Sequence, residues 1–271
     1  MHFMYSLNKI PMNNKKEKFA RFGIATKGFV YCLIGGLTVA AAFGEGGKKT
    51  GSSGVLETLS SQPFGQIILG ITALGLLGFT FYRFYQAIAD PQDIGNDFKG
   101  FVTRFGFALS AIFYGFLAFT AAKMIFTSGG GSGGGQESMA STLLSKPFGQ
   151  VLVGIVGAAF LGKSIYQFYR AYSGKFKENV QAAELDSNVE SMVLKTGYIG
   201  YTARGVVIAV ISYLMFRAAF SANSSEAGGT KDAFSFLQNE FGTIVLAVIA
   251  AGLLAYGFFM IVKARYKTLG I

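Results

Sequence analysis

The amino-acid sequence contains six apolar stretches, each long enough to cross the hydrocarbon core of a bilayer. A membrane-spanning helix needs about 20 apolar residues, because the hydrocarbon layer is about 30 Å thick and an α-helix rises about 1.5 Å per residue. The six stretches cover residues 22–43, 64–88, 101–126, 148–172, 197–220 and 241–264. The chain is therefore predicted to be an all-α membrane protein with six transmembrane helices.

The composition agrees with this class. Charged residues make up only 14% of the chain, whereas ordinary soluble domains carry about 25%. The formal net charge of +10 would favour nucleic acid as the partner of a soluble protein. Here the cations flank apolar stretches, which instead favours membrane lipids with anionic headgroups and argues against nucleic acid.

Lysine and arginine are distributed unequally between the two sides of the predicted membrane. Thirteen lie in the N-terminal segment, the connections after the second and fourth helices, and the C-terminal tail, whereas four lie on the other side: Lys48, Lys49, Lys146 and Lys231. The excess of positive charge predicts that both termini are cytoplasmic. The basic segment before the first helix does not resemble a cleaved signal peptide, so we expect the first helix to be an uncleaved anchor.

The sequence also repeats itself three times. The start of each odd helix recurs, with Arg21, Phe22 and Gly23 matching Arg104, Phe105 and Gly106, and more loosely Tyr198, Ile199 and Gly200. The turn before each even helix recurs as well, as Pro63, Phe64 and Gly65, then Pro147, Phe148 and Gly149, then Phe241 and Gly242 after Glu240. We predict a basic N-terminal segment, 1–19, followed by repeats at 20–92, 101–174 and 195–271.

Each repeat has two helices, so every copy enters the membrane from the same side. Parallel repeats of this kind are related by an axis along the membrane normal. Three copies therefore predict a bundle with pseudo-threefold symmetry about that axis.

These motifs resemble a bacterial membrane family that is catalogued as domain of unknown function 1206. The resemblance rests on the repeated helix starts, on Tyr31 and Tyr114, on the Pro-Phe-Gly turn, and on Asp90 and Pro91 after the second helix. It covers residues 20–264 and implies a multi-pass protein of the bacterial cytoplasmic (inner) membrane, built from three two-helix units. The second copy departs from the pattern, because Ser110 and Ala111 replace the basic residue and glycine found in the first and third copies. The family carries no established activity to transfer.

The six apolar stretches contain no Asp, Glu or His, and the single histidine is His2. Proton relays inside membranes are usually built from such residues, and metal and haem sites need clusters of ligating side chains. We therefore expect neither enzymatic activity nor a bound metal or cofactor.

Basic residues do enter the apolar stretches. Lys27 and Arg204 lie at equivalent repeat positions, and Lys163 lies deeper in its helix. Long basic side chains can extend along apolar surface so that the charge reaches the headgroups, and we expect this of Arg83 and Arg170 nearer the helix ends. The alternative for Lys27, Lys163 and Arg204 is a site between helices for an anion or a lipid headgroup.

Small residues recur every four positions on two helices: Gly36 and Ala40 on the first, and Gly154, Ala158 and Gly162 on the fourth. Such stripes let helices approach closely in lipid. They predict helix packing within the chain, with homo-oligomerisation as the alternative.

The favoured hypothesis for function is a non-catalytic structural or accessory protein that binds a membrane-protein partner or a lipid. The alternative is a channel or small-molecule (anion) transporter that uses the pseudo-threefold axis as its pathway. An enzyme acting on lipid has the least support, because the apolar stretches lack a polar catalytic cluster.

Overall fold

The computed structural model describes residues 14–91, 94–95, 97–126, 142–173, 176–177, 180 and 186–266. Most of the basic N-terminal segment, residues 1–13, and the end of the third repeat, residues 267–271, lie outside the described residues. Six helices are long and apolar enough to cross a membrane: α1 (Asn14–Ala42), α3 (Gly65–Ala89), α4 (Phe98–Phe126), α6 (Gly149–Tyr172), α8 (Ser187–Ser221) and α9 (Thr230–Arg265). The described residues form no strand, so the prediction of an all-α protein with six membrane-spanning helices is confirmed.

The helices α3 and α6 begin at the repeated Phe–Gly turn. Phe64 and Phe148 both have a left-handed backbone, with φ of 61°, which is strained for a bulky residue. The glycine that follows has no room for a side chain, since a Cβ on Gly65 would lie 2.5 Å from the carbonyl oxygen of Leu59. In the third copy the left-handed residue is Gly242, with φ of 85°, where α9 bends.

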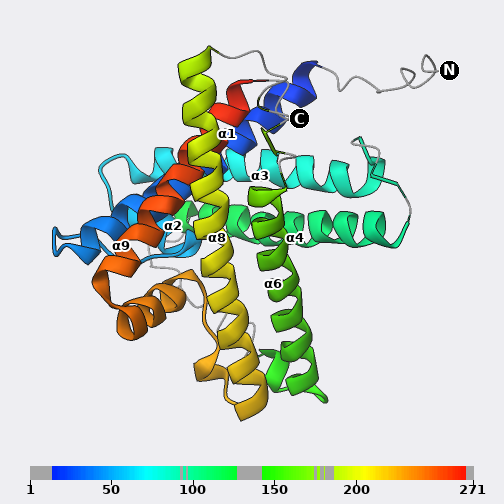
Figure 1. Cartoon of the computed structure of the whole chain (residues 1–271), viewed down its shortest axis with the longest axis vertical. Helices are drawn as coiled ribbons and strands as arrows, with labels where there is room; N and C mark the ends of the chain where they lie inside the picture. Colours follow the sequence, from blue (N-terminus) through cyan, green and yellow to red (C-terminus); the bar gives the residue numbers. More distant parts are fainter. Residues whose placement is uncertain are drawn as a thin grey trace.

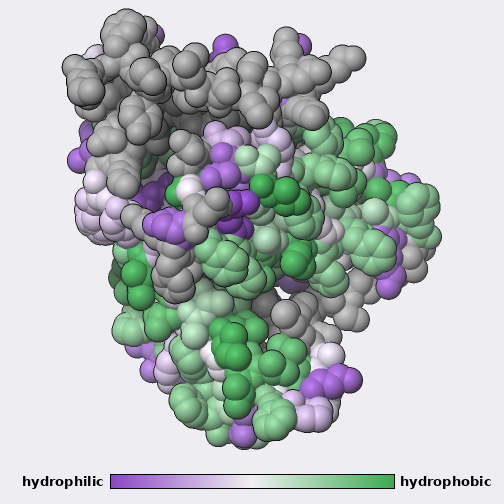
Figure 2. All heavy atoms as spheres, turned by 90° about the vertical axis from the view of Figure 1, so that its right-hand side faces the viewer, coloured by the Kyte–Doolittle hydropathy of each residue, from purple (hydrophilic) through white to green (hydrophobic). Residues whose placement is uncertain are grey.

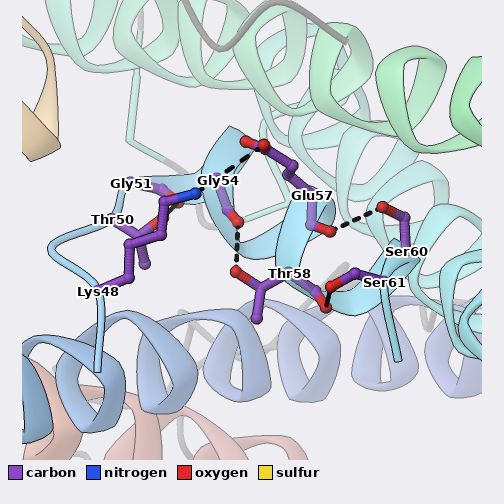
Figure 3. A network of polar contacts seen from close by, with 8 residues as sticks. All are labelled: Lys48, Thr50, Gly51, Gly54, Glu57, Thr58, Ser60 and Ser61. Carbon is purple, nitrogen blue, oxygen red and sulfur yellow. Dashed lines mark hydrogen bonds and ion pairs between the residues drawn. The ribbon is translucent and has the colours of Figure 1, made fainter. Parts of the chain in front are cut away.

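The turn before α3 is held by a short helix, α2 (Ser52–Ser60). Figure 3 shows Glu57 paired with Lys48, with Nζ and Oε1 3.9 Å apart, while the hydroxyls of Thr58 and Ser60 donate to backbone carbonyls within α2. The apolar side chains Val55, Leu56 and Leu59 are buried. Of the two orientations open to these side chains, toward lipid or toward the bundle, the structure therefore shows the second.

The six helices pair across repeat boundaries. α3 lies along α4, α6 lies along α8, and α9 lies along α1, as Figure 1 shows. Each even helix thus packs against the odd helix of the next repeat, and the last repeat returns to the first. This cyclic pairing is the arrangement that pseudo-threefold symmetry requires.

Matching contacts occur at equivalent positions of the three pairs. The start of each odd helix contacts the end of the even helix before it in the ring: Arg104 with Ile88, Arg21 with Arg265, and Tyr198 with Tyr172. Each of the two arginines donates a hydrogen bond to the partner carbonyl oxygen, at 2.9 and 2.8 Å respectively. A cation at a helix C-terminus satisfies a free carbonyl and opposes the negative end of the helix dipole.

Within a repeat, the two helices pack together in the first and third copies. Gly23 of α1 lies against the backbone of Phe79 in α3, and Thr26 lies against Gly75. The third repeat has the same arrangement: Gly200 faces the backbone of Tyr256, and Ala203 faces Gly252.

The second repeat lacks this interface. α4 and α6 make no extended contact through their described residues, and no atom would lie within 4 Å of a Cβ added to Gly106. We call the two unpaired faces the open seam; its five residues, all exposed, are Gly106, Leu109, Ala159, Gly162 and Lys163.

The side chains of the second repeat explain why the seam is open. Ala159 stands where the other repeats have glycine, and Leu109 stands opposite in place of Thr26 or Ala203. Lys163 occupies the position of Phe79 and Tyr256. Close helix approach in lipid depends on small residues on both faces, so the larger side chains keep α4 and α6 apart.

The glycines marked by the sequence pattern are not those that pack most closely. A Cβ added to Gly36 would lie 3.9 Å from Leu254, and one added to Gly154 would lie 4.0 Å from Ala219. Gly162 has no neighbour within 4 Å, since it belongs to the open seam. Ala40 is half-buried and Ala158 is exposed.

Two other glycines of α1, Gly28 and Gly35, approach α9 more closely than Gly36 does. A Cβ added to Gly35 would lie 2.5 Å from the backbone nitrogen of Leu254, and one added to Gly28 would lie 2.7 Å from the carbonyl oxygen of Gly257. The buried face of α1 is thus turned by one residue from the stripe that the small residues indicated.

Hydrophobic side chains dominate the lower part of the surface in Figure 2, as a surface in contact with lipid requires. On α4 the exposed apolar residues include Phe101, Ile112 and Phe119, and on α6 they include Ile155 and Ile165. These faces match a multi-pass membrane protein.

The first prediction compares the equivalent residues Gly23 and Gly106. Gly23→Leu is expected to destabilise the fold by about 3 kcal/mol, because an added side chain would strike the backbone of Phe79. Gly106→Leu is expected to change stability by no more than about 0.5 kcal/mol, because it faces the open seam. Thermal unfolding of the purified variants in one mild detergent measures both effects. Equal losses at the two positions would show that α4 and α6 pack as the other repeats do.

Candidate anion-binding site

Lys27 is buried at the centre of the bundle, with 2% of its surface exposed. Its Nζ lies over four aromatic rings, 4.7 Å from the ring centroid of Phe79, 5.4 Å from Tyr114, 5.6 Å from Tyr256 and 6.0 Å from Tyr31. These rings come from α3, α4, α9 and α1. The ammonium is therefore held by cation–π contacts from four helices.

Arg204 joins the same group of rings from α8. Its Nη1 donates a hydrogen bond of 2.8 Å to the hydroxyl of Tyr256, and its Nε donates one of 3.1 Å to the hydroxyl of Tyr31. The guanidinium also lies 4.9 and 5.2 Å from the centroids of these two rings. Lys27 and Arg204 thus share two tyrosines.

Two further arginines extend the group toward the ends of the helices. Arg83 lies 5.0 Å from the ring centroid of Phe79, and Arg170 lies 5.0 Å from that of Tyr201. The rings of Tyr201 and Tyr256 are 5.5 Å apart. We call this continuous group the basic–aromatic cluster; its members are Lys27, Tyr31, Phe79, Arg83, Tyr114, Arg170, Tyr201, Arg204 and Tyr256.

The cations of the cluster have no carboxylate partner among the described residues. The ion pairs found there join Arg21 with Glu17, Lys48 with Glu57, and Arg217 with Glu226, all outside the cluster. Burying a cation without a counter-charge is costly, and a cation–π contact returns only about 2 kcal/mol when desolvated. The cluster therefore carries positive charge that an anion would neutralise.

Hydrogen-bond donors near the cations also lack partners. In the described part of the chain, Arg83 Nε, Gln167 Nε2 and Tyr201 Oη are buried with no hydrogen-bond acceptor. Gln167 occupies in the second repeat the position that Arg83 occupies in the first. A buried donor left unpaired costs about 1–3 kcal/mol. Phosphate and carboxylate oxygens accept hydrogen bonds from such donors.

The three predicted binding residues are placed differently. The structure brings Lys27 and Arg204 together inside the cluster, against aromatic rings rather than extended toward headgroups. Lys163 is exposed in the open seam, and its Nζ lies 5.9 Å from the ring centroid of Phe160. The residues of the repeated turn lie at the start of α3 and α6 and at the bend of α9, and their aromatic side chains, Phe64, Phe148 and Phe241, are exposed.

Arg83 and Arg170 are members of the cluster that sequence reasoning missed, since it placed both side chains at the membrane boundary. Tyr31 and Tyr114 entered only through the family motif, and Tyr256 was not noticed. An alignment of the repeats could have identified Tyr256, because it occupies the position in the third repeat that Lys163 occupies in the second. The residues equivalent to Lys163 in the other two repeats, Phe79 and Tyr256, both lie against Lys27.

Among the described residues, no group of three or more His, Cys, Asp or Glu side chains could hold a metal ion. The groups that the cluster offers are ammonium, guanidinium and phenol. Ammonium and guanidinium groups are positively charged, and all three groups can donate hydrogen bonds to oxygen acceptors.

The fold and this cluster define a multi-pass membrane protein built from three tandem two-helix repeats. The chain belongs to the family described as Domain of Unknown Function (DUF1206), which matches residues 22–90, 105–174 and 199–267. It is 31% identical over 264 residues to the uncharacterized protein YxxB of Bacillus subtilis (strain 168), covering 96% of this chain and 95% of that protein. The family predicted from the motifs is thereby confirmed. No solved structure matches the chain.

Proposed function

We propose that this protein is a non-catalytic membrane protein that binds an anionic group, of the phosphate or carboxylate type, in the basic–aromatic cluster. The observation that carries the proposal is the burial of Lys27 among four rings with no carboxylate partner in the described part of the chain. An anion in contact with the cluster would neutralise this charge in a low-dielectric setting, where the attraction is strong.

The unpaired donors support the same ligand chemistry. An oxyanion presents several acceptors at once and could take hydrogen bonds from Arg83 Nε and Tyr201 Oη, which lack acceptors in the described structure. Such an anion could be the headgroup of a membrane lipid or a soluble ion. Both share the oxygen chemistry that the cluster would recognise.

The distribution of charge supports an orientation for the site. Arg83 and Arg170 lie in the last two turns of α3 and α6, on the side where α1 begins and α9 ends. That side carries the excess of lysine and arginine along the chain. By the positive-inside rule the site faces the cytoplasm, with both termini on the same side of a bacterial inner membrane.

A binding role is favoured over permeation because rings fill the centre at the level of the cluster. The centroids of Phe79 and Tyr114 are 4.7 Å apart, and those of Tyr31 and Tyr256 are 4.9 Å apart. Aromatic pairs at these distances are in direct contact. A pathway for ions along the pseudo-threefold axis would have to displace them.

The test is the unfolding temperature of the purified full-length chain in a neutral detergent, with phosphatidylglycerol, phosphatidylcholine or inorganic phosphate added. A ligand at about 100 times its Kd stabilises by about 2.7 kcal/mol, so an anionic ligand is expected to raise the temperature by about 5 °C or more. Arg204→Gln is expected to remove this rise. Lys123→Gln, at an exposed position near the end of α4, is expected to keep it.

The two anions distinguish the source of the ligand: stabilisation by phosphatidylglycerol alone identifies a lipid, and stabilisation by phosphate identifies a soluble anion. The proposal fails if neither anion stabilises more than phosphatidylcholine does, or if Arg204→Gln leaves the rise unchanged.

A further inference from the structure

We propose that the open seam between α4 and α6 is a lateral binding site for an anionic phospholipid. Its headgroup would contact Lys163 and its acyl chains would lie along the exposed faces of the two helices. This inference rests on the proposed function and names the ligand, a lipid that approaches from within the bilayer rather than a soluble ion.

The seam is confined to the second repeat. The equivalent residues on α1 and α3, Gly23, Thr26, Gly75, Gly78 and Phe79, are all buried, whereas the five residues of the seam are all exposed. The helix bundle is therefore closed at the α1–α3 and α8–α9 interfaces, and it is accessible from the membrane at the open seam between α4 and α6.

Lys163 places a charge at the level of the cluster. The equivalent residues, Phe79 and Tyr256, both lie against Lys27, with ring centroids 4.7 and 5.6 Å from its Nζ. Lys163 also lies nine residues before Tyr172, which is about 14 Å along the helix, so its backbone lies within the hydrocarbon layer and its long side chain can extend toward the headgroups. A cation at that depth is costly unless an anion or water accompanies it.

The charge of the occupant follows from what the chain can supply. Lys163 forms no ion pair with a described carboxylate. A second copy docked on the seam could not provide one at this depth, because none of the six apolar stretches contains Asp or Glu. The partner of Lys163 must bring its own negative charge, and an anionic phospholipid is the component of the membrane that does so.

The faces beside Lys163 suit the rest of such a molecule. On α4 the seam continues through Phe105, Ile112 and Phe116, which are 55%, 61% and 55% exposed. On α6 it continues through Ile155, which is 60% exposed. These residues follow the seam at spacings of three or four, so they share its face of each helix. The apolar surface can accommodate acyl chains while the headgroup reaches the lysine.

The absence of tryptophan from the chain allows a direct test. Leu109→Trp places a single fluorophore in the seam, and Leu74→Trp places one on the exposed face of α3, where Leu74 is 58% exposed. The full-length variants are reconstituted with phospholipids carrying brominated acyl chains, which quench tryptophan on contact. At the seam, brominated phosphatidylglycerol is expected to reach half-maximal quenching at about one fifth of the mole fraction that brominated phosphatidylcholine needs, the preference that one cation gives. At Leu74→Trp the two lipids are expected to quench alike.

Lys163→Gln in the Leu109→Trp background is expected to abolish the preference while quenching by both lipids continues. Equal quenching by the two lipids in the Leu109→Trp protein, or a preference that survives Lys163→Gln, overturns the proposal. Ile112→Trp, one turn along α4, serves as a second reporter and must give the same preference.

Failure here is distinguishable from failure of the proposed function. If phosphate or phosphatidylglycerol stabilises the protein through Arg204 but the seam reporters show no headgroup preference, the cluster binds an anion and the seam does not bind the lipid. If no anion stabilises the protein, the function itself is wrong.

Discussion

Lys27→Met is expected to raise the unfolding temperature of the ligand-free protein and to abolish the stabilisation that an anionic ligand provides. Lys27 is 2% exposed and has no carboxylate partner among the described residues. Methionine fills a similar volume and carries no charge to desolvate. Replacing buried charged groups with well-packed apolar ones often stabilises a protein by about 1–4 kcal/mol. We expect about 2 kcal/mol, or roughly 5 °C.

The measurement is thermal unfolding of the wild-type chain, Lys27→Met and Lys123→Met in the same detergent, with and without phosphatidylglycerol. Lys123→Met controls for removal of a positive charge at an exposed position and is expected to behave as the wild type does. A ligand-free Lys27→Met protein that unfolds earlier, and that still responds to the lipid, would show that Lys27 is a structural residue. Gain of stability with loss of binding is the signature of a site kept charged for its ligand.

Gly35→Leu is expected to disrupt the fold, whereas Gly36→Leu is expected to be tolerated. An added Cβ at Gly35 would lie 2.5 Å from the nitrogen of Leu254 and 2.6 Å from the carbonyl oxygen of Ala250, and backbone atoms cannot move aside cheaply. At Gly36 the nearest atom is 3.9 Å away, at the end of a flexible side chain. Overpacking costs about 1–3 kcal/mol and more where backbones touch, so we expect at least 3 kcal/mol at Gly35 and less than about 0.5 kcal/mol at Gly36.

The yield of monodisperse protein and its unfolding temperature measure this difference. Because the two glycines are adjacent in α1, the two variants differ mainly in the direction in which the new side chain points from the helix. The reverse result, with Gly36→Leu disruptive and Gly35→Leu tolerated, would mean that α1 is turned by one residue from the orientation described.

This pair also shows where sequence reasoning reached its limit. Small residues occupy both position 35 and position 36, but a spacing of four reaches Ala40 from Gly36 and Val39 from Gly35, so the sequence favours the stripe through Gly36. Which stripe is buried depends on the partner helix, α9, which follows about 200 residues later in the chain. By contrast, the helices themselves followed directly from the length of the apolar stretches.

The candidate site was reached from the sequence only in part. Lys27 and Arg204 stand out because they are equivalent cations in apolar stretches. The residues around them cannot be identified in the same way. The hydroxyl of Tyr31, which accepts a hydrogen bond from Arg204, belongs to a different repeat, 173 residues away. The open seam was also missed. Leu109 and Ala159 are visible as larger residues, but only the packed structure shows that the helices fail to close around them.

The second repeat breaks the pseudo-symmetry in two related ways. Ser110 replaces the cation that the other copies carry as Lys27 and Arg204, and Lys163 replaces the aromatic ring that they carry as Phe79 and Tyr256. Each repeat therefore still contributes a cation to this part of the membrane, but that of the second repeat lies on its even helix. The same exchange leaves the helices of that repeat unpaired and gives the lysine access to lipid.

The measurement that tests the central claim most directly is native mass spectrometry of the full chain, extracted gently from its own membrane. The claim that the basic–aromatic cluster binds an anion predicts a bound anionic phospholipid or oxyanion on the wild type and on Lys123→Gln, and its loss from the double variant Lys27→Met with Arg204→Gln. A wild-type protein without adducts, or a double variant that retains the same adduct, would contradict it.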